Sequence, residues 1–83
     1  MHSEKMAFNL VRTGHLSECE ITPSNEKKGF FNVQTVAPQI AGNDRYILTN
    51  ALGEKVAVNN IDKAKEIAKT LGFKQHAVKV LHN

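Results

Sequence analysis

The clearest hydrophobic pattern in the chain lies between residues 61 and 71. Apolar residues recur there with the i, i+3, i+4, i+7 spacing of one helix face, at Ile61, Ala64, Ile67, Ala68 and Leu71. Asn59 or Asn60 can cap the first turn by accepting a backbone N–H, and Gly72 suits the left-handed position after the last turn. The pattern therefore predicts an amphipathic helix over residues 61–71.

Alternation of apolar and polar residues predicts strands on both sides of this helix. Before the helix, it predicts a hairpin of residues 45–49 and 54–58 around a turn at residues 50–53. After the helix, it predicts a last strand at residues 76–81, which we expect to pair beside one of the two hairpin strands.

The pattern near the N-terminus fits two structures. Apolar residues alternate through residues 6–13, which favours a strand, and Val11 is β-branched. The alternative is a helix over residues 4–13, capped by Ser3 and ended by Gly14. We expect the strand, with residues 1–5 frayed.

The middle of the chain predicts a second hairpin. Residues 15–21 show an imperfect alternation typical of an exposed strand, and residues 22–29 have the composition of a turn. Residues 30–36 form a good strand pattern, and residues 37–44 are expected to be a connection.

Together these elements predict an α+β fold in a single small domain, residues 1–83. We expect an antiparallel or mixed sheet of about five or six strands, with the helix at about residues 61–71 packed on one face. One helix can cover only part of such a sheet. The other face is therefore solvated, closed by curling of the sheet, or used for binding.

Composition places the chain in the soluble globular class. Of its 83 residues, 41% are hydrophobic and 23% are charged. No apolar run approaches the roughly 18 residues that a membrane span requires, and the polar N-terminus does not resemble a secretory signal. Cys19 is the single cysteine, so no internal disulfide can form, and we expect a cytoplasmic location without membrane association.

The positive charge is unevenly distributed. Residues 1–52 carry no net charge, whereas residues 53–83 carry the whole excess of +3. The lysines that we expect to contact a partner lie on the outer side of the predicted helix, at its exit and at the tip of a loop: Lys63, Lys65, Lys69, Lys74, Lys27 and Lys28. The competing interpretation is a solvated helix face in which Asp62 pairs with Lys65 and Glu66 with Lys69.

The residues that could support catalysis are poorly placed for it. On one strand, His15 and Cys19 would lie about 13 Å apart, too far for a base to activate a thiol. We therefore expect Cys19 to act as a small apolar residue, and Glu18 and Glu20 to be solvated. No spacing typical of a metal site is present, so we expect no enzyme activity, no metal and no cofactor.

The sequence thus favours a small non-enzymatic binding module whose lysine-rich helix face meets an acidic macromolecule, either nucleic acid or protein. The alternative is an inhibitor or adaptor, for example from a mobile genetic element, that binds a larger protein through an exposed sheet face or edge strand. A homodimer formed through the sheet face is a variant of that alternative.

Overall fold

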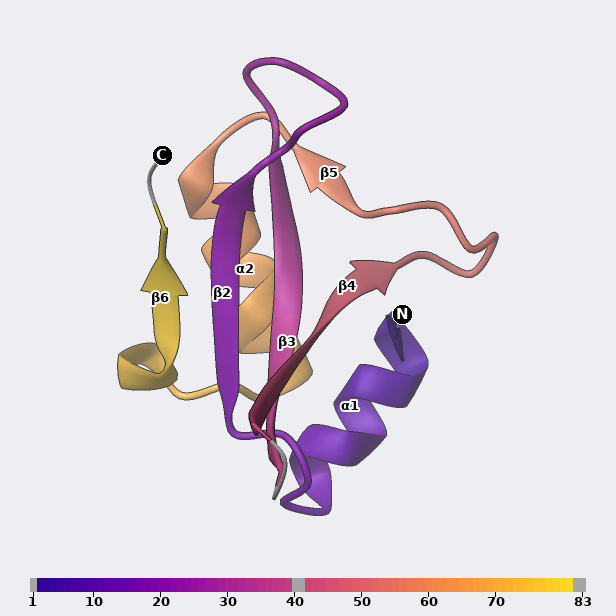
Figure 1. Cartoon of the computed structure of the whole chain (residues 1–83), viewed down its shortest axis with the longest axis vertical. Helices are drawn as coiled ribbons and strands as arrows, with labels where there is room; N and C mark the ends of the chain where they lie inside the picture. The colour runs from indigo at the N-terminus through magenta and orange to yellow at the C-terminus, as the bar shows by residue number, and fades with distance from the viewer. Residues whose placement is uncertain (1, 40–41, 82–83) are drawn as a thin grey trace.

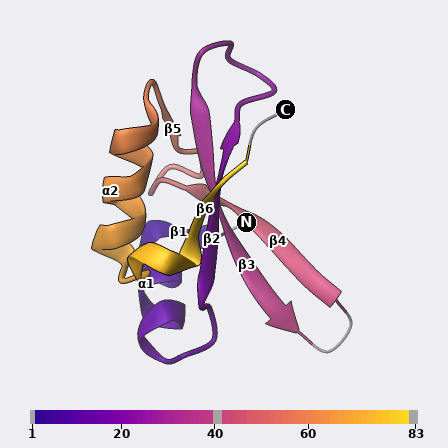
Figure 2. The ribbon, with the colours of Figure 1, turned by 90° about the vertical axis from the view of Figure 1, so that its left-hand side faces the viewer.

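A computed structural model describes residues 2–39 and 42–81. Two α-helices lie on one side of a six-stranded sheet (Figures 1 and 2). In chain order the elements are β1 (His2–Ser3), α1 (Glu4–Arg12), β2 (Glu18–Pro23), β3 (Phe31–Gln39), β4 (Gly42–Thr49), β5 (Ala57–Val58), α2 (Ile61–Leu71), the 3₁₀ helix η1 (Gln75–Ala77) and β6 (Val78–Val80). The predicted α+β class is confirmed.

The sheet is mixed, with the strand order β1-β4-β3-β2-β6 and β5 paired to β3. The central strands β2, β3 and β4 are antiparallel to one another, whereas β1 runs parallel to β4 and β6 runs parallel to β2. The second predicted hairpin is confirmed as β2 and β3. The connection expected at residues 37–44 is wrong for its described residues, because residues 37–39 extend β3, residues 42–44 begin β4, and the two segments pair with each other.

The helix α2 agrees with its prediction at both ends. The Asn60 side chain accepts the backbone N–H of Lys63 at 2.7 Å, which caps the first turn. Gly72 adopts a positive φ of 103°, and the N–H of Phe73 donates to the carbonyl of Ala68 at 3.1 Å. The buried face consists of Ala64, Ala68 and Leu71.

The strand expected at residues 6–13 is wrong, because this segment belongs to the helix α1. Its cap is Ser3, whose hydroxyl accepts the N–H of Met6 at 3.2 Å. The helix buries Ala7 completely and leaves Met6 and Phe8 about half exposed. The alternation of large apolar residues suggested a strand with Met6 and Phe8 on its buried face. The residue that faces the core is instead the small Ala7 between them. At the chain start, where fraying was expected, His2 and Ser3 pair with β4.

The first predicted hairpin forms its turn but not its full ladder. The N–H of Asn50 donates to the carbonyl of Glu54 at 2.8 Å, closing the turn. Beyond the bridge from Thr49 to Lys55, the chain leaves β4, and Ala57–Val58 pairs with β3 instead. The side chain of Asn32 on β3 helps to hold this crossing by donating to the carbonyl of Val56 at 3.0 Å.

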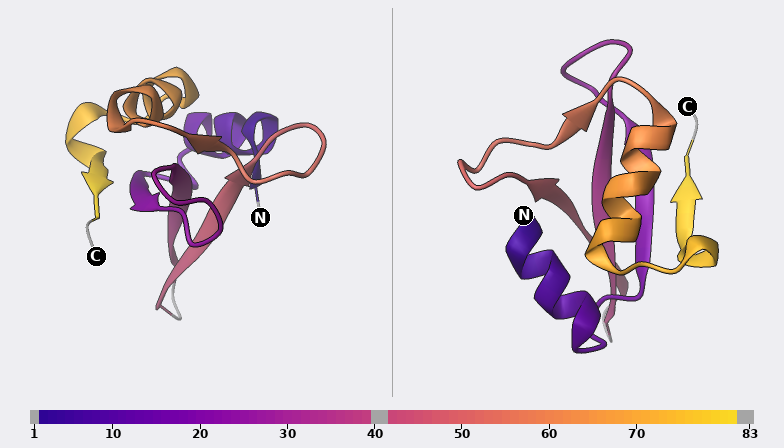
Figure 3. Two further views of the ribbon diagram at one scale, coloured as in Figure 1. Left: turned by 90° about the horizontal axis from the view of Figure 1, so that it is seen from above. Right: turned by 180° about the vertical axis from the view of Figure 1, so that it is seen from behind.

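The expected pairing of the last strand is also wrong, since β6 pairs with β2 and with neither strand of the first predicted hairpin. Residues 76 and 77, predicted to begin that strand, belong instead to η1. The edge of β2 that faces away from β3 was left open by the second hairpin, and β6 occupies it after α2 has crossed the sheet (Figure 3).

The core lies between the helices and the sheet. Cys19 and Ile21 from β2, Val33 from β3 and Leu48 from β4 are fully buried there. The helices contribute mainly alanines, Ala7, Ala64 and Ala68, whose small side chains let the helix backbones approach the sheet closely. On the helix-free face, the most deeply buried charged residue is Glu20.

Candidate docking groove

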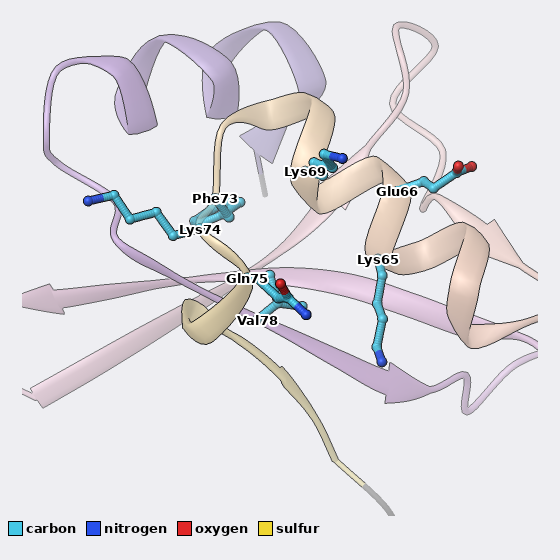
Figure 4. Close-up of a pocket in the computed structure, with 7 residues that line it drawn as sticks. All are labelled: Lys65, Glu66, Lys69, Phe73, Lys74, Gln75 and Val78. Carbon is cyan, nitrogen blue, oxygen red and sulfur yellow. The ribbon is translucent and has the colours of Figure 1, made fainter.

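A groove of about 730 Å³ lies between α2 and the segment formed by η1 and β6. Its lysines are Lys65 and Lys69 from α2 and Lys74 from the turn that follows. Glu66, Phe73, Gln75 and Val78 complete the lining (Figure 4). We call this set of residues the lysine groove.

Helix geometry places Lys65 and Lys69 on the same flank of α2. They are four residues apart, so they lie one turn from each other, and each directly follows a buried alanine, Ala64 or Ala68. That flank faces β6. The chain then turns at Gly72, which has a left-handed backbone conformation, so that Lys74 and Gln75 line the same groove.

The side chains of the lysine groove point in different directions (Figure 4). Lys65 and Gln75 extend into the space between α2 and the η1–β6 segment. Lys69 and Lys74 extend outward from the rim. Phe73 forms part of the floor but is only 5% exposed, so its ring belongs to the core more than to the surface. The groove therefore combines an apolar base with lysine side chains around it.

The ammonium groups of the lysine groove are not neutralised by ion pairs. Over residues 2–39 and 42–81, no ion pair joins Lys65, Lys69 or Lys74 to a carboxylate, so the pairs of the competing interpretation, with Asp62 and Glu66, are not present. Three cations outside the groove are paired: Arg45 with Glu20, Lys79 with Glu18, and Lys55 with Glu26. Glu66 is the single acidic residue among the groove-lining side chains named above.

The other lysines expected at the site lie elsewhere. Lys63 lines a separate cavity of about 460 Å³, on the flank of α2 that faces the start of α1, together with Glu4 and Ile67. Lys27 and Lys28 belong to the loop between β2 and β3, at the end of the molecule opposite η1 (Figure 1). The Lys27 ammonium lies 4.0 Å from the centroid of the Phe30 ring, a cation–π contact.

Four groove residues were not singled out as site residues from the sequence: Glu66, Phe73, Gln75 and Val78. Phe73 carried a signal, because an apolar residue after Gly72 is typical of a helix C-cap, but that signal concerns stability. Gln75 and Val78 carried none. They reach the groove only because β6 pairs with β2, a contact between distant parts of the chain.

The residues considered for catalysis remain apart. Cys19 is fully buried, and burial raises the pKa of its thiol to about 12, which agrees with its expected role as a small apolar residue. His15 lies outside β2, with its Nδ1 atom 2.8 Å from the hydroxyl of Thr13. Within the part of the chain that the structure describes, no three His, Cys, Asp or Glu side chains gather as a metal site would require.

The expectation that Glu20 is solvated is wrong. Its carboxylate is 2.7 Å from Nε of Arg45 and accepts a hydrogen bond from Gln34 at 2.8 Å. Donation from the Arg45 guanidinium is the main reason why the pKa of Glu20 is lowered below its usual value. The side chains of this cluster come from β2, β3 and β4, and their hydrogen bonds link the three strands on the helix-free face of the sheet.

Two further observations concern the helices of the chain and its similarity to known proteins. None of the helices within the described residues is both long and apolar enough to span a membrane. Comparison of the chain with protein-family models, curated proteins and solved structures gives no match.

Proposed function

We propose that this protein is a non-enzymatic binding module that docks an acidic macromolecule on the lysine groove. The observation that supports this function most strongly is the grouping of Lys65, Lys69 and Lys74 around one concave surface, without carboxylate partners among the described residues. Clustered cations that the protein does not neutralise raise the local positive potential and attract anions.

The chemistry of these cations indicates how an anion is held. A lysine ammonium is a compact charge on a flexible stem, so it suits attraction to carboxylates or phosphates more than the planar, bidentate recognition that arginine provides. Three lysines around the groove against one glutamate leave a positive excess. We therefore expect binding that depends on charge and weakens with salt.

Two observations favour an acidic protein over nucleic acid. Single-stranded nucleic acid is usually held by bases that stack on exposed aromatic rings. The one aromatic ring among the groove-lining residues, that of Phe73, is only 5% exposed and so offers little surface for stacking. The groove also has an apolar wall at Val78, which suits aliphatic side chains between acidic ones. The helix-free sheet face offers less to a partner, because Glu20 and Glu18 are already paired there.

Fluorescence anisotropy with a labelled decamer of glutamate tests the proposal. We expect the double substitution Lys65→Gln/Lys69→Gln to weaken binding about tenfold. Lys27→Gln/Lys28→Gln is the matched control, since it removes the same charge at the opposite end of the molecule, and we expect about a twofold effect or less. A single-stranded oligonucleotide of equal length serves as the competing ligand.

The outcomes separate the possibilities. Equal losses in the two double variants would show that only net charge matters and would overturn the proposed groove. Binding of the oligonucleotide with higher affinity than the glutamate decamer would assign the groove to nucleic acid instead of protein. For either ligand, affinity should fall between about 50 and 200 mM salt.

A further inference from the structure

The strand β6 forms an edge of the sheet, directly beside the lysine groove. In the strand order, β6 pairs only with β2, and no described element lies on its outer side (Figures 1 and 3). Val78 belongs both to this strand and to the groove lining. A ligand seated in the groove therefore lies next to an unpaired strand edge.

The register shows which backbone groups of β6 are free. The N–H of Leu81 donates to the carbonyl of Ile21 on β2, at 2.8 Å. Successive residues of a strand turn their backbone groups to opposite sides, so Lys79 also faces β2, whereas Val78 and Val80 face outward. The N–H of Val78 already donates to the carbonyl of Gln75 and is not free. The outward edge thus offers both backbone groups of Val80 and the carbonyl of Val78.

The same alternation decides where the side chains of an added strand would lie. Val78 and Val80 point to the helix side of the sheet, and Lys79 points to the other side, where it is 3.6 Å from Glu18. A peptide paired with β6 at the usual spacing of about 4.8 Å would direct every second side chain toward α2. Those side chains would meet Lys65, which extends into the space between α2 and the η1–β6 segment.

We propose that the ligand of the lysine groove is an extended acidic segment of a partner protein, which adds to β6 as a further strand of the sheet. This inference rests on the proposed function and specifies its ligand. Backbone hydrogen bonds to Val80 supply affinity that is independent of sequence, and the lysines select acidic side chains at alternate positions. The occupant is thus an extended segment, because the backbone groups of a helix are already bonded within the helix and cannot pair with a strand edge.

The test compares three labelled decapeptides of alternating Glu and Val. One is unmodified, and the other two carry N-methyl groups on alternate residues, one peptide for each of the two possible phases. Methylation leaves the charge unchanged but removes the N–H donors on one edge of the peptide. We expect the unmodified peptide to bind and one methylated phase to bind about tenfold more weakly, because only one edge of an added strand faces β6.

A protein variant gives the reciprocal measurement. Val80→Pro removes the outward N–H while leaving the bonds to β2 intact, since proline is tolerated on edge strands. Its circular dichroism spectrum should match that of the unmodified protein, and its affinity for the unmodified peptide should fall about tenfold. Amide hydrogen exchange is the second readout: the Val80 amide should become protected on binding, whereas that of Lys79, which already faces β2, should change little.

Failure of this inference is distinguishable from failure of the proposed function. If both methylated phases bind as well as the unmodified peptide, and Val80 gains no protection, strand addition is overturned. The proposed function then still stands if Lys65→Gln/Lys69→Gln weakens binding. If the decapeptide does not bind at all, or binds the lysine variant equally well, both the strand addition and the docking groove are overturned.

Discussion

The Nε atom of Arg45 lies 2.7 Å from Oε1 of Glu20, and this ion pair joins β4 to β2 across the intervening strand β3. A second bond, from Nη2 of Arg45 to Oε2 of Glu20, measures 3.2 Å, and Gln34 of β3 donates to the same carboxylate. The glutamate side chain is 8% exposed, whereas that of the arginine is 47% exposed. The ion pair therefore links the two strands that flank β3 on the helix-free side of the sheet.

This pairing predicts acid sensitivity. The pKa of Glu20 is lowered in the folded protein, mainly by the hydrogen bond from Arg45, so the ionised carboxylate stabilises the fold above its unfolded pKa of about 4.3. That contribution is lost as the pH falls through the lower, folded-state pKa. Urea unfolding between pH 7 and 3 should show a decrease below about pH 4.3 that is smaller in Glu20→Gln. The control variant Glu66→Gln, which changes an exposed residue of α2, should show the same decrease in stability as the unmodified protein. Equal slopes for all three proteins would contradict the prediction.

The cap of α2 provides a second prediction. Asn60 accepts the Lys63 amide, whereas Asn59 precedes the cap and is exposed. Asn60→Ala should lower the free energy of unfolding by about 1 kcal/mol, because one backbone donor of the first turn loses its partner. Asn59→Ala should change it by less than about 0.5 kcal/mol. Urea titrations of the two variants measure the difference, and equal effects would show that Asn60 does not act as the cap.

A third prediction concerns the glycine that ends α2. Gly72 has a φ of 103°, and a Cβ atom there would lie 3.3 Å from Cγ1 of Val11 on α1. Gly53 is the control, with a φ of 81° and nothing within 4 Å of its would-be Cβ. Each alanine substitution should cost about 1–2 kcal/mol for the left-handed backbone. Gly72→Ala should cost more because of the contact.

A double-mutant cycle isolates that contact. Adding Val11→Ala should relieve part of the cost of Gly72→Ala but none of the cost of Gly53→Ala. Thermal unfolding of the single and double variants provides the measurement. Strict additivity at both glycines would show that α1 does not pack against the end of α2 as the structure describes.

The buried cysteine gives a fourth prediction. Burial raises the pKa of the Cys19 thiol to about 12, and the thiolate is the reactive form. Iodoacetamide at pH 8 should leave the folded protein unmodified and should alkylate it rapidly in concentrated urea. Intact-mass spectrometry follows the reaction. Alkylation of the folded protein at the rate seen in urea would contradict the burial of β2.

The sequence could predict those elements whose signals are local. For α2, the apolar stripe, the cap at Asn60 and the stop at Gly72 all lie within one short segment, and each acts as expected. For α1, the apolar spacing is compatible with both helix and strand. The choice depends on whether Ala7 or its larger neighbours face the core, and only tertiary packing decides that.

The candidate site was predictable in part for the same reason. The spacing of Lys65 and Lys69 places them on one helix flank whatever the rest of the fold. Lys63 was grouped with them, although two residues correspond to about 200° around a helix, and it faces the other cavity. The remaining wall of the groove depends on which strand receives β6, and a pairing between distant segments leaves no local trace in the sequence.

The position of β6 has a consequence for how the chain assembles. Its partner residues, such as Cys19 and Val78, are far apart along the chain, so their pairing requires closure of a long loop, whereas the β2–β3 and β3–β4 ladders join neighbours. We infer that β6 docks late in folding and opens early in partial unfolding. The groove would then be the last surface to mature, and a nascent or heat-stressed chain would lose its ligand before it lost its helices.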